Sequence, residues 1–136
     1  MNRYVLDANA LLTYFLAEPG AEQVRRCLHE ASSGAAELHM SLINYGECVY
    51  NVERRYGLAA VTRLQMFLDN YPVTYHEVDH RRVLEAAHIK ARYPISYADA
   101  FAAALAQELG ATLVTGDPEF HAVEHLVTVE WLTEGG

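Results

Sequence analysis

Short apolar runs alternate along this chain with longer segments that have helical periodicity. The extended runs cover residues 4–6, 37–40, 73–78, 111–115 and 127–131. The helical segments cover residues 8–17, 21–31, 42–56, 58–68, 81–92 and 97–109, and a short helix follows residue 118. Strands that alternate with helices are joined by right-handed crossovers, which give a mostly parallel sheet covered on both faces. The pattern therefore predicts a three-layer α/β/α sandwich with a mostly parallel central sheet.

Length and composition are typical of one globular domain. With 136 residues, 51% of them hydrophobic, the chain is expected to form a single domain over residues 1–136. Its longest apolar run, residues 100–106, is much shorter than the ~20 residues that span a bilayer. The few residues before Asp7 leave no room for the core of a signal peptide. The two cysteines, Cys27 and Cys48, are too few for a disulfide scaffold or a zinc knuckle. We therefore expect a cytoplasmic protein with no membrane segment.

The charge balance is strongly acidic. Ten Lys and Arg residues stand against eighteen Asp and Glu residues, so the formal net charge is −8. Such a surface repels phosphate backbones and attracts cations or basic partners. Any chemistry on nucleic acid therefore requires a local means of tolerating a polyanion.

Two aspartates follow predicted strands at the point where each strand ends. Asp7 comes directly after residues 4–6, and Asp117 comes just after residues 111–115. Ligand sites in open parallel sheets form outside the carboxyl ends of the strands, so both side chains are expected at one edge of the sheet. Asp117 precedes Pro118, which also fits an ordinary helix N-cap. An acid that abuts a buried strand has little structural use, which favours a functional role for Asp7.

Two further acids on predicted helices could join the same edge. The predicted apolar face of segment 42–56 consists of Leu42, Tyr45, Val49, Val52 and Tyr56. Helical spacing places Glu47 nearly opposite that face, where it could also be an ordinary solvated residue. Asp99 lies in the first turn of segment 97–109, and together with Ser96 it also fits a capping box. Capping and metal binding are compatible, because a carboxylate has several acceptor sites.

A cluster of these four acids would need cations. Two unit charges 4 Å apart repel by about 4 kcal/mol at an effective dielectric of 20, and four acids contain six such pairs. Oxygen ligands of this kind select Mg²⁺ or Mn²⁺ over zinc. Two such ions are the standard machinery of phosphodiester cleavage, and bound metal converts an acidic pocket into a phosphate receptor.

Four segments of the chain carry a family resemblance. They are YVLDANALL at residues 4–12, SLINYGE at 41–47, ISYADA at 95–100 and LVTGDPEF at 113–120. In this order and spacing the sequence resembles the PIN-domain nucleases, and more narrowly the VapC-type toxins of toxin–antitoxin pairs. The resemblance implies that Asp7, Glu47, Asp99 and Asp117 hold one or two Mg²⁺ or Mn²⁺ ions. It also implies that Asn9 and Thr115 are polar neighbours of that site.

The same resemblance implies an activity and partners. The expected activity is metal-assisted cleavage of structured RNA, often tRNA or ribosomal RNA. The expected partners are a second copy of the chain, forming a homodimer, and a VapB-type antitoxin whose basic segment fills the acidic pocket. A net charge of −8 suits such a basic partner.

Basic residues and histidines suggest further sites. Segment 81–92 contains Arg81, Arg82, Lys90 and Arg92, which either form a solvated face or bind RNA phosphates. The pairs His76/His80 and His121/His125 have metal-like spacing, but a closed zinc site needs four ligands and no cysteine lies near either pair in sequence.

Two other functions compete with a nuclease. A haloacid-dehalogenase-like phosphatase also begins with an aspartate after its first strand, but it needs a second acid two residues later, where this chain has Asn9. A catalytically silent module whose acidic pocket only docks a basic partner is the other alternative. Metal-dependent RNA cleavage would distinguish the nuclease from that module.

Overall fold

A five-stranded sheet with only parallel pairings forms the centre of the fold. The computed structural model describes residues 1–133, so the last three residues of the predicted 1–136 domain lie outside it. The strand order is β3 (Val73–His76), β2 (Ala36–Ser41), β1 (Asn2–Leu6), β4 (Thr112–Thr115) and β5 (Val129–Trp131). Each neighbouring pair is parallel, from the β3–β2 edge to the β4–β5 edge. The prediction of a mostly parallel sheet is confirmed.

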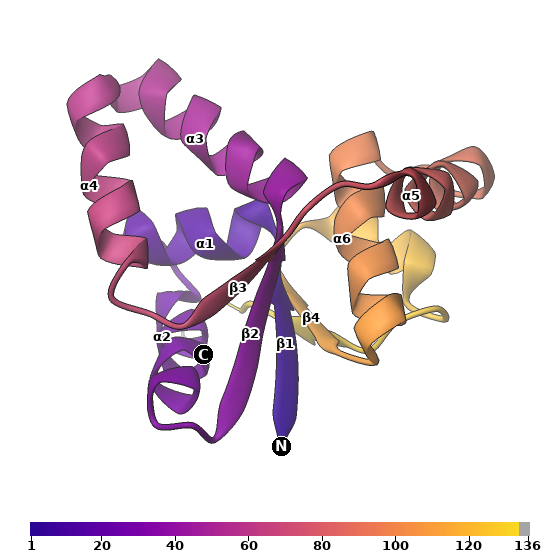
Figure 1. Ribbon diagram of the computed structural model, residues 1–136, viewed down its shortest axis with the longest axis horizontal. Helices are drawn as coiled ribbons and strands as arrows, with labels where there is room; N and C mark the ends of the chain where they lie inside the picture. The colour runs from indigo at the N-terminus through magenta and orange to yellow at the C-terminus, as the bar shows by residue number, and fades with distance from the viewer. Residues whose placement is uncertain (134–136) are drawn as a thin grey trace.

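Helices cover both faces of this sheet (Figure 1). In chain order they are α1 (Ala8–Phe15), α2 (Ala21–Ser32), α3 (Leu42–Tyr56), α4 (Leu58–Leu68), α5 (His80–Arg92), α6 (Tyr97–Leu109) and the 3₁₀ helix η1 (Pro118–Val123). Helices α1 to α4 pack together on one side, and α5, α6 and η1 pack on the other (Figure 1). The predicted three-layer α/β/α sandwich is confirmed.

Alternation along the strands divides the core between the two faces. Val5 and Leu113 point to one face and pack with residues of α5, α6 and η1, including the fully buried Phe120. Leu6 and Val114 point to the other face and pack against α1 and α2. Successive side chains of a strand alternate between faces, so a strand buried on both sides reads as a continuous apolar run.

Helix α6 is buried on nearly all sides. Every residue from Asp99 to Ala106 is buried, and five of these eight residues are alanine. A helix that is apolar all round belongs in the interior of a protein. Small side chains let α6 lie close to β1, β2 and β4, which fixes the position of its first turn relative to the sheet.

The strand order reverses beside β1. From β1 the chain moves first to β2 and then to β3 on one side, and it later places β4 on the other side of β1. Such a reversal of strand order is where open α/β sheets bind their ligands. Asp7 follows β1 and Asp117 follows β4, so both lie beside this reversal.

The apolar face predicted for α3 is partly wrong. Leu42 and Tyr56 are 42% and 57% exposed, while the buried residues of α3 are Asn44, Cys48 and Val52. The buried face is rotated because α3 packs between α1 and α4 and also meets the first turn of α6, where the Asn44 side chain donates to the Ala98 carbonyl at 3.0 Å. This rotation brings Glu47 to the boundary of the interior.

The cysteines are free, as their number suggested. Cys27 and Cys48 are both buried and form no disulfide.

In the part of the chain that the structure describes, no helix combines the length and the apolar character needed to cross a bilayer.

Candidate metal centre

Asp7 is a buried carboxylate at the end of β1. Its side chain is 1% exposed, and its Oδ1 accepts a hydrogen bond of 2.8 Å from the backbone N–H of Ala10. Its Oδ2 accepts a hydrogen bond of 2.5 Å from the Thr115 hydroxyl. The expectation that Asp7 has little structural use is therefore wrong, because it is the N-cap of α1.

Thr115 and Asn9 join the ends of β1 and β4. The Thr115 hydroxyl donates to Asp7 and accepts from the backbone N–H of Asp117 at 3.0 Å. The Asn9 Oδ1 accepts from the backbone N–H of Gly116 at 2.7 Å. A Cβ at Gly116 would lie 3.0 Å from that same oxygen, so a larger residue would require the Asn9 amide to shift and would disturb this hydrogen bond. These two predicted neighbours therefore fix Asp7 and Asp117 relative to each other.

Three acids that come from two elements form a cluster. Carboxylate oxygens of Asp99, Asp117 and Glu119 lie within 4.8 Å of one another. Asp99 comes from the first turn of α6, and the other two come from the start of η1. Sequence reasoning found Asp99 and Asp117 but missed Glu119, although Glu119 stands in the motif at 113–120. A 3₁₀ turn after Pro118 was the signal that could have placed it beside Asp117.

The capping alternatives have different outcomes for the two aspartates. Asp117 is an N-cap, because its Oδ1 accepts from the backbone N–H of Glu119 at 2.9 Å and Pro118 follows. The capping box predicted for Asp99 is only half formed. Ser96 Oγ accepts from the Asp99 N–H at 3.1 Å, but the Ser96 N–H donates to Glu119 Oε1 at 2.6 Å. The Asp99 carboxylate is thus not used for capping.

Glu47 brings a fourth element to the site. It is half-buried on α3, and its Oε1 is a buried oxygen without a hydrogen-bond partner among the described residues. Its prediction as a solvated residue is wrong for that oxygen. An unpaired buried oxygen costs about 1–3 kcal/mol, more when it is charged, so such atoms indicate a missing partner.

Electrostatics link all of these acids. Burial is the main cause that raises the pKa of Asp7 from 3.8 to about 7, and Asp117 and Glu47 raise it further. Burial also raises the pKa of Asp99 to about 8, with added repulsion from Asp117, Asp7 and Glu119. The pKa of Glu47 is raised mainly by burial and also by the charges of Asp117 and Glu119, while the nearby Asn44 amide acts in the opposite direction. Within residues 1–133, none of these five carboxylates forms an ion pair with Lys, Arg or His.

Comparison with protein families identifies the domain. The model of the PIN domain matches residues 4–126, which includes all five acids. The chain belongs to the PIN-domain family. This membership argues against the phosphatase alternative. That enzyme class needs an acid at the position of Asn9, whose amide oxygen here accepts a hydrogen bond from Gly116.

Solved structures with the same fold include members of toxin–antitoxin complexes. VapBC2 from Rickettsia felis, bound to a promoter DNA fragment, has a TM-score of 0.77 at 18% identity, covering 96% of this chain and 99% of that chain. VapBC-1 from nontypeable Haemophilus influenzae has a TM-score of 0.69 at 21% identity, covering 97% and 99%. VapC20 from Mycobacterium tuberculosis, a sarcin-ricin loop cleaving toxin, has a TM-score of 0.70 at 18% identity, covering 88% and 94%. No curated protein sequence matches the chain significantly.

The acids of this PIN domain suit a hard divalent cation. Every candidate ligand is a carboxylate oxygen, which is the donor type that Mg²⁺ and Mn²⁺ prefer. Among residues 1–133 no Lys, Arg or His side chain forms an ion pair with these acids, and burial raises the pKa values of Asp7 and Asp99. The cluster of Asp99, Asp117 and Glu119 therefore fits a divalent ion, while Asp7 and Glu47 lie outside that group of three.

The histidines do not form a metal site of their own. His121 stacks on Trp131 and bonds Glu124, while His125 bonds the Tyr93 hydroxyl. Of the residues that the structure describes, only Asp99, Asp117 and Glu119 form a group of three or more possible metal ligands. The pattern at residues 121 and 125 is thus explained by packing.

The basic residues of α5 divide into two groups. Arg81 and Arg82 both pair with Glu108 of α6 at 3.1 Å, and Arg82 also donates to the Glu77 carbonyl at 2.7 Å. These pairs bind α5 to α6, which gives Arg82 a structural use that the sequence did not indicate. Lys90 and Arg92 are exposed in the last turn of α5.

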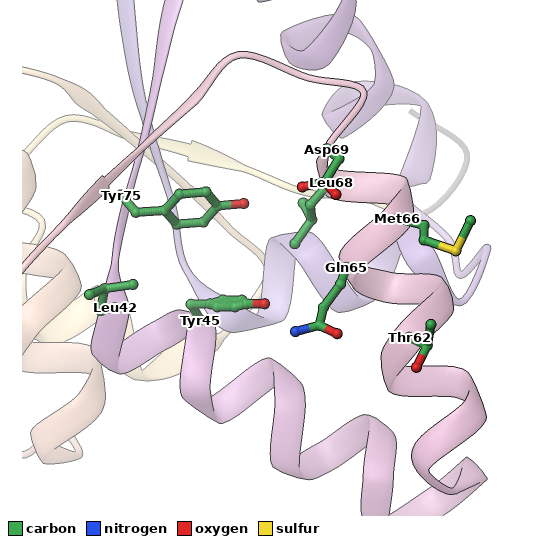
Figure 2. Close-up of a pocket in the computed structure, with 8 residues that line it drawn as sticks. All are labelled: Leu42, Tyr45, Thr62, Gln65, Met66, Leu68, Asp69 and Tyr75. Atoms are coloured by element: carbon green, nitrogen blue, oxygen red, sulfur yellow. The ribbon is translucent and has the colours of Figure 1, made fainter.

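A second hollow lies away from the acids of the PIN domain. It measures about 510 Å³ and is formed by α3, α4 and β3. Figure 2 shows the rings of Tyr45 and Tyr75 on one side of it and Gln65 and Met66 of α4 on the other. None of the five acids lines this hollow, so a small-molecule pocket does not coincide with the acidic site.

Proposed function

We propose that this PIN domain is the endoribonuclease toxin of a toxin–antitoxin pair and that it cuts structured RNA with Mg²⁺ or Mn²⁺. The proposal depends on one observation. Asp99, Asp117 and Glu119 form a cluster within 4.8 Å, the nearby charges of Asp117 and Glu47 raise the pKa of Asp7, and among residues 1–133 no basic side chain forms an ion pair with any of these acids. A structural cluster of this kind would repel itself, whereas a hydrolytic site with bound cations would not.

Hydrogen bonds and burial determine the positions of Asp7, Asp99 and Asp117. Asp7, Glu47, Asp99 and Asp117 would hold one or two ions, which when bound supply an activated water and stabilise charge on the phosphate. Thr115 orients the Asp7 carboxylate by donating to its Oδ2. Asn9 accepts a hydrogen bond from the backbone N–H of Gly116 and so holds the turn that precedes Asp117. Burial of Asp7 and Asp99 excludes water from the carboxylates and strengthens their interaction with a cation.

The proposed partners follow from the charge of the chain and from its structural neighbours. Several structures of the same fold are VapBC complexes, in which a toxin is bound by its antitoxin. A net charge of −8 and a cluster of acids without ion pairs among residues 1–133 suit a basic antitoxin segment in this protein as well. We also propose a homodimer and an RNA substrate of the tRNA or ribosomal RNA class, since VapC20 is a sarcin-ricin loop cleaving toxin.

Cleavage assays with structured RNA test this function. The purified protein is expected to cut tRNA or ribosomal RNA fragments with added Mn²⁺ or Mg²⁺, and to lose that activity in excess EDTA. Glu47→Gln is expected to reduce cleavage roughly 100-fold or more, because metal catalysis contributes several kcal/mol. The matched control is Glu37→Gln, which neutralises an exposed carboxylate on β2 that pairs with Arg3.

Two results would contradict the nuclease. Cleavage that persists in EDTA would exclude the metal mechanism, and equal activity of the Glu47→Gln and Glu37→Gln variants would exclude the site. Tight binding of a basic peptide without any cleavage of RNA would favour the silent docking module instead.

The exposed end of α5 provides a test of RNA binding. We propose that Lys90 and Arg92, together with Arg81 and Arg82, contact RNA phosphates. The double variant Lys90→Glu/Arg92→Glu is expected to weaken RNA binding and to reduce the slope of log affinity against log salt by about 1–2, one unit or slightly less for each lost phosphate contact. It avoids the Glu108 ion pairs, so α5 should remain in place.

A matched control carries the same change in net charge elsewhere. Arg55→Glu/Arg63→Glu alters exposed residues at the end of α3 and on α4, on the other side of the molecule from α5 (Figure 1). Its salt slope should stay at the wild-type value. Equal slopes for the two double variants would mean that the end of α5 contributes only net charge.

A further inference from the structure

Glu119 accepts the hydrogen bond from the N-cap N–H of α6 that Asp99 would accept in an ordinary capping box. A capping box pairs the N-cap side chain with the N–H of the third helical residue, and that residue's side chain with the N-cap N–H. In α6 the N-cap is Ser96 and the third residue is Asp99, and the first of these two bonds is present at 3.1 Å. The second bond is made by Glu119 of η1, whose Oε1 accepts from the Ser96 N–H at 2.6 Å.

Because Glu119 accepts this hydrogen bond, the Asp99 carboxylate is not used for helix capping. A carboxylate in the first turn of a helix is drawn to the unpaired N–H groups there. Because Glu119 already satisfies the Ser96 N–H, the Asp99 carboxylate can face Asp117 instead, and the three carboxylates come within 4.8 Å of one another. Asp99 is 5% exposed, so it has little solvent to stabilise any other orientation.

Glu119 also fixes the turn that carries Asp117. Its own N–H donates to Asp117 Oδ1 at 2.9 Å, and Phe120 beside it is fully buried. One residue thus connects the start of η1 to the start of α6 through two hydrogen bonds. The distance between Asp99 and Asp117 depends on this connection.

We propose that Glu119 is a positioning residue that takes over the capping of α6 and thereby releases the Asp99 carboxylate for metal binding. This inference rests on the proposed metal site and adds a residue to it. Glu119 acts through the Ser96 N–H, so an oxygen acceptor is required at this position and a negative charge is not.

Two variants of Glu119 separate the effect of its oxygen acceptor from the effect of its negative charge. Glu119→Gln keeps an oxygen at the same reach, whereas Glu119→Ala removes it and lets Asp99 turn to the Ser96 N–H. Calorimetric titration with Mn²⁺ should give an affinity within about threefold of wild type for Glu119→Gln. It should give a loss of roughly 10- to 100-fold for Glu119→Ala, the usual effect of removing a partner that orients a metal ligand. Glu124→Ala, at the C-terminal end of η1 and bonded to His121, is the control and should bind like wild type.

A second measurement does not depend on metal binding. The amide proton resonance of Ser96 in NMR spectra should be strongly downfield in the wild type, because its N–H donates to Glu119 Oε1 at 2.6 Å. In Glu119→Ala the resonance should become sensitive to Asp99→Asn, because Asp99 then completes the capping box, whereas in the wild type Asp99→Asn should move it little.

The outcomes separate this inference from the proposed function. Equal loss of Mn²⁺ affinity in both Glu119 variants would mean that charge or direct ligation matters, and unchanged affinity in both would mean that Glu119 is dispensable. Either result overturns the inference while the metal site stands. A wild-type protein that binds no Mn²⁺ would overturn the proposed function, and the Ser96 resonance would then still test the exchange of capping partners.

Discussion

Replacing Asp7 with asparagine is expected to abolish RNA cleavage and to raise the melting temperature of the metal-free protein. Ionising Asp7 in the folded state costs on the order of 4 kcal/mol near pH 8, because burial and its acidic neighbours raise its pKa from 3.8 to about 7. The neutral amide of the Asp7→Asn variant would remove that cost, and its oxygen could still cap α1. The amide nitrogen would no longer accept the Thr115 proton, so we expect a net gain of about 1–3 kcal/mol, or a rise of several degrees.

Asp79→Asn is the matched control for this prediction. Asp79 is also an aspartate N-cap, since its Oδ1 accepts from the Arg82 N–H at 2.9 Å, but it is exposed at the start of α5. Asn and Asp are nearly equal N-caps, so the control should change neither cleavage nor melting temperature appreciably. Retained cleavage in Asp7→Asn would contradict the proposed catalytic site, and a fall in its melting temperature would contradict the cost of burying this charge.

The stability of the metal-free protein is expected to fall as pH rises from about 4 to about 8. Asp7 and Asp99 have raised pKa values, about 7 and about 8, against 3.8 for each group in the unfolded chain. The folded state therefore binds more protons than the unfolded state between these limits. Stability from these groups is fully present below pH 3.8 and is lost as pH increases through the folded-state values.

Thermal melts at a series of pH values, with EDTA or with Mn²⁺, measure this effect. The range from pH 7 to pH 9 avoids the lowered pKa of His76, which changes stability in the opposite direction below about pH 6.5, and the raised pKa values of Cys27 and Cys48 add to the fall only as pH approaches 9. Mn²⁺ at 100 times its dissociation constant should restore about 2.7 kcal/mol, and more as pH rises and the ligands ionise. A melting temperature that is flat from pH 7 to pH 9 in EDTA, or unaffected by Mn²⁺, would contradict the prediction. Asp7→Asn should flatten the profile in part.

The sequence predicted the order of elements well because burial in a parallel sheet has a clear local pattern. Buried strands such as β1 and β4 read as short apolar runs, and α6 reads as an apolar helix between Ser96 and Gly110. It also predicted that Asp7 and Asp117 converge, since the carboxyl ends of parallel strands share one edge. These features depend on periodicity and chain order alone.

Local pattern was less informative where two elements compete for one group. The capping box expected at Asp99 is only half formed, because Glu119, 23 positions from Ser96, accepts the hydrogen bond from the Ser96 N–H. The face expected for α3 was partly wrong because contacts with α1, α4 and α6 rotate the helix, which buries Asn44 and one oxygen of Glu47. Periodicity cannot report a partner that lies far away in the sequence.

The sequence by itself determined the parallel α/β architecture, the family and the position of Asp7 and Asp117 beside the carboxyl ends of β1 and β4. Only the tertiary structure decided which carboxylate oxygens are used as helix caps and which are left without partners. The physical reason is that a hydrogen bond depends on distance in space. The contacts from Thr115 to Asp7 and from Glu119 to Ser96 join residues far apart in the chain, and these contacts determine the orientation of the carboxylates.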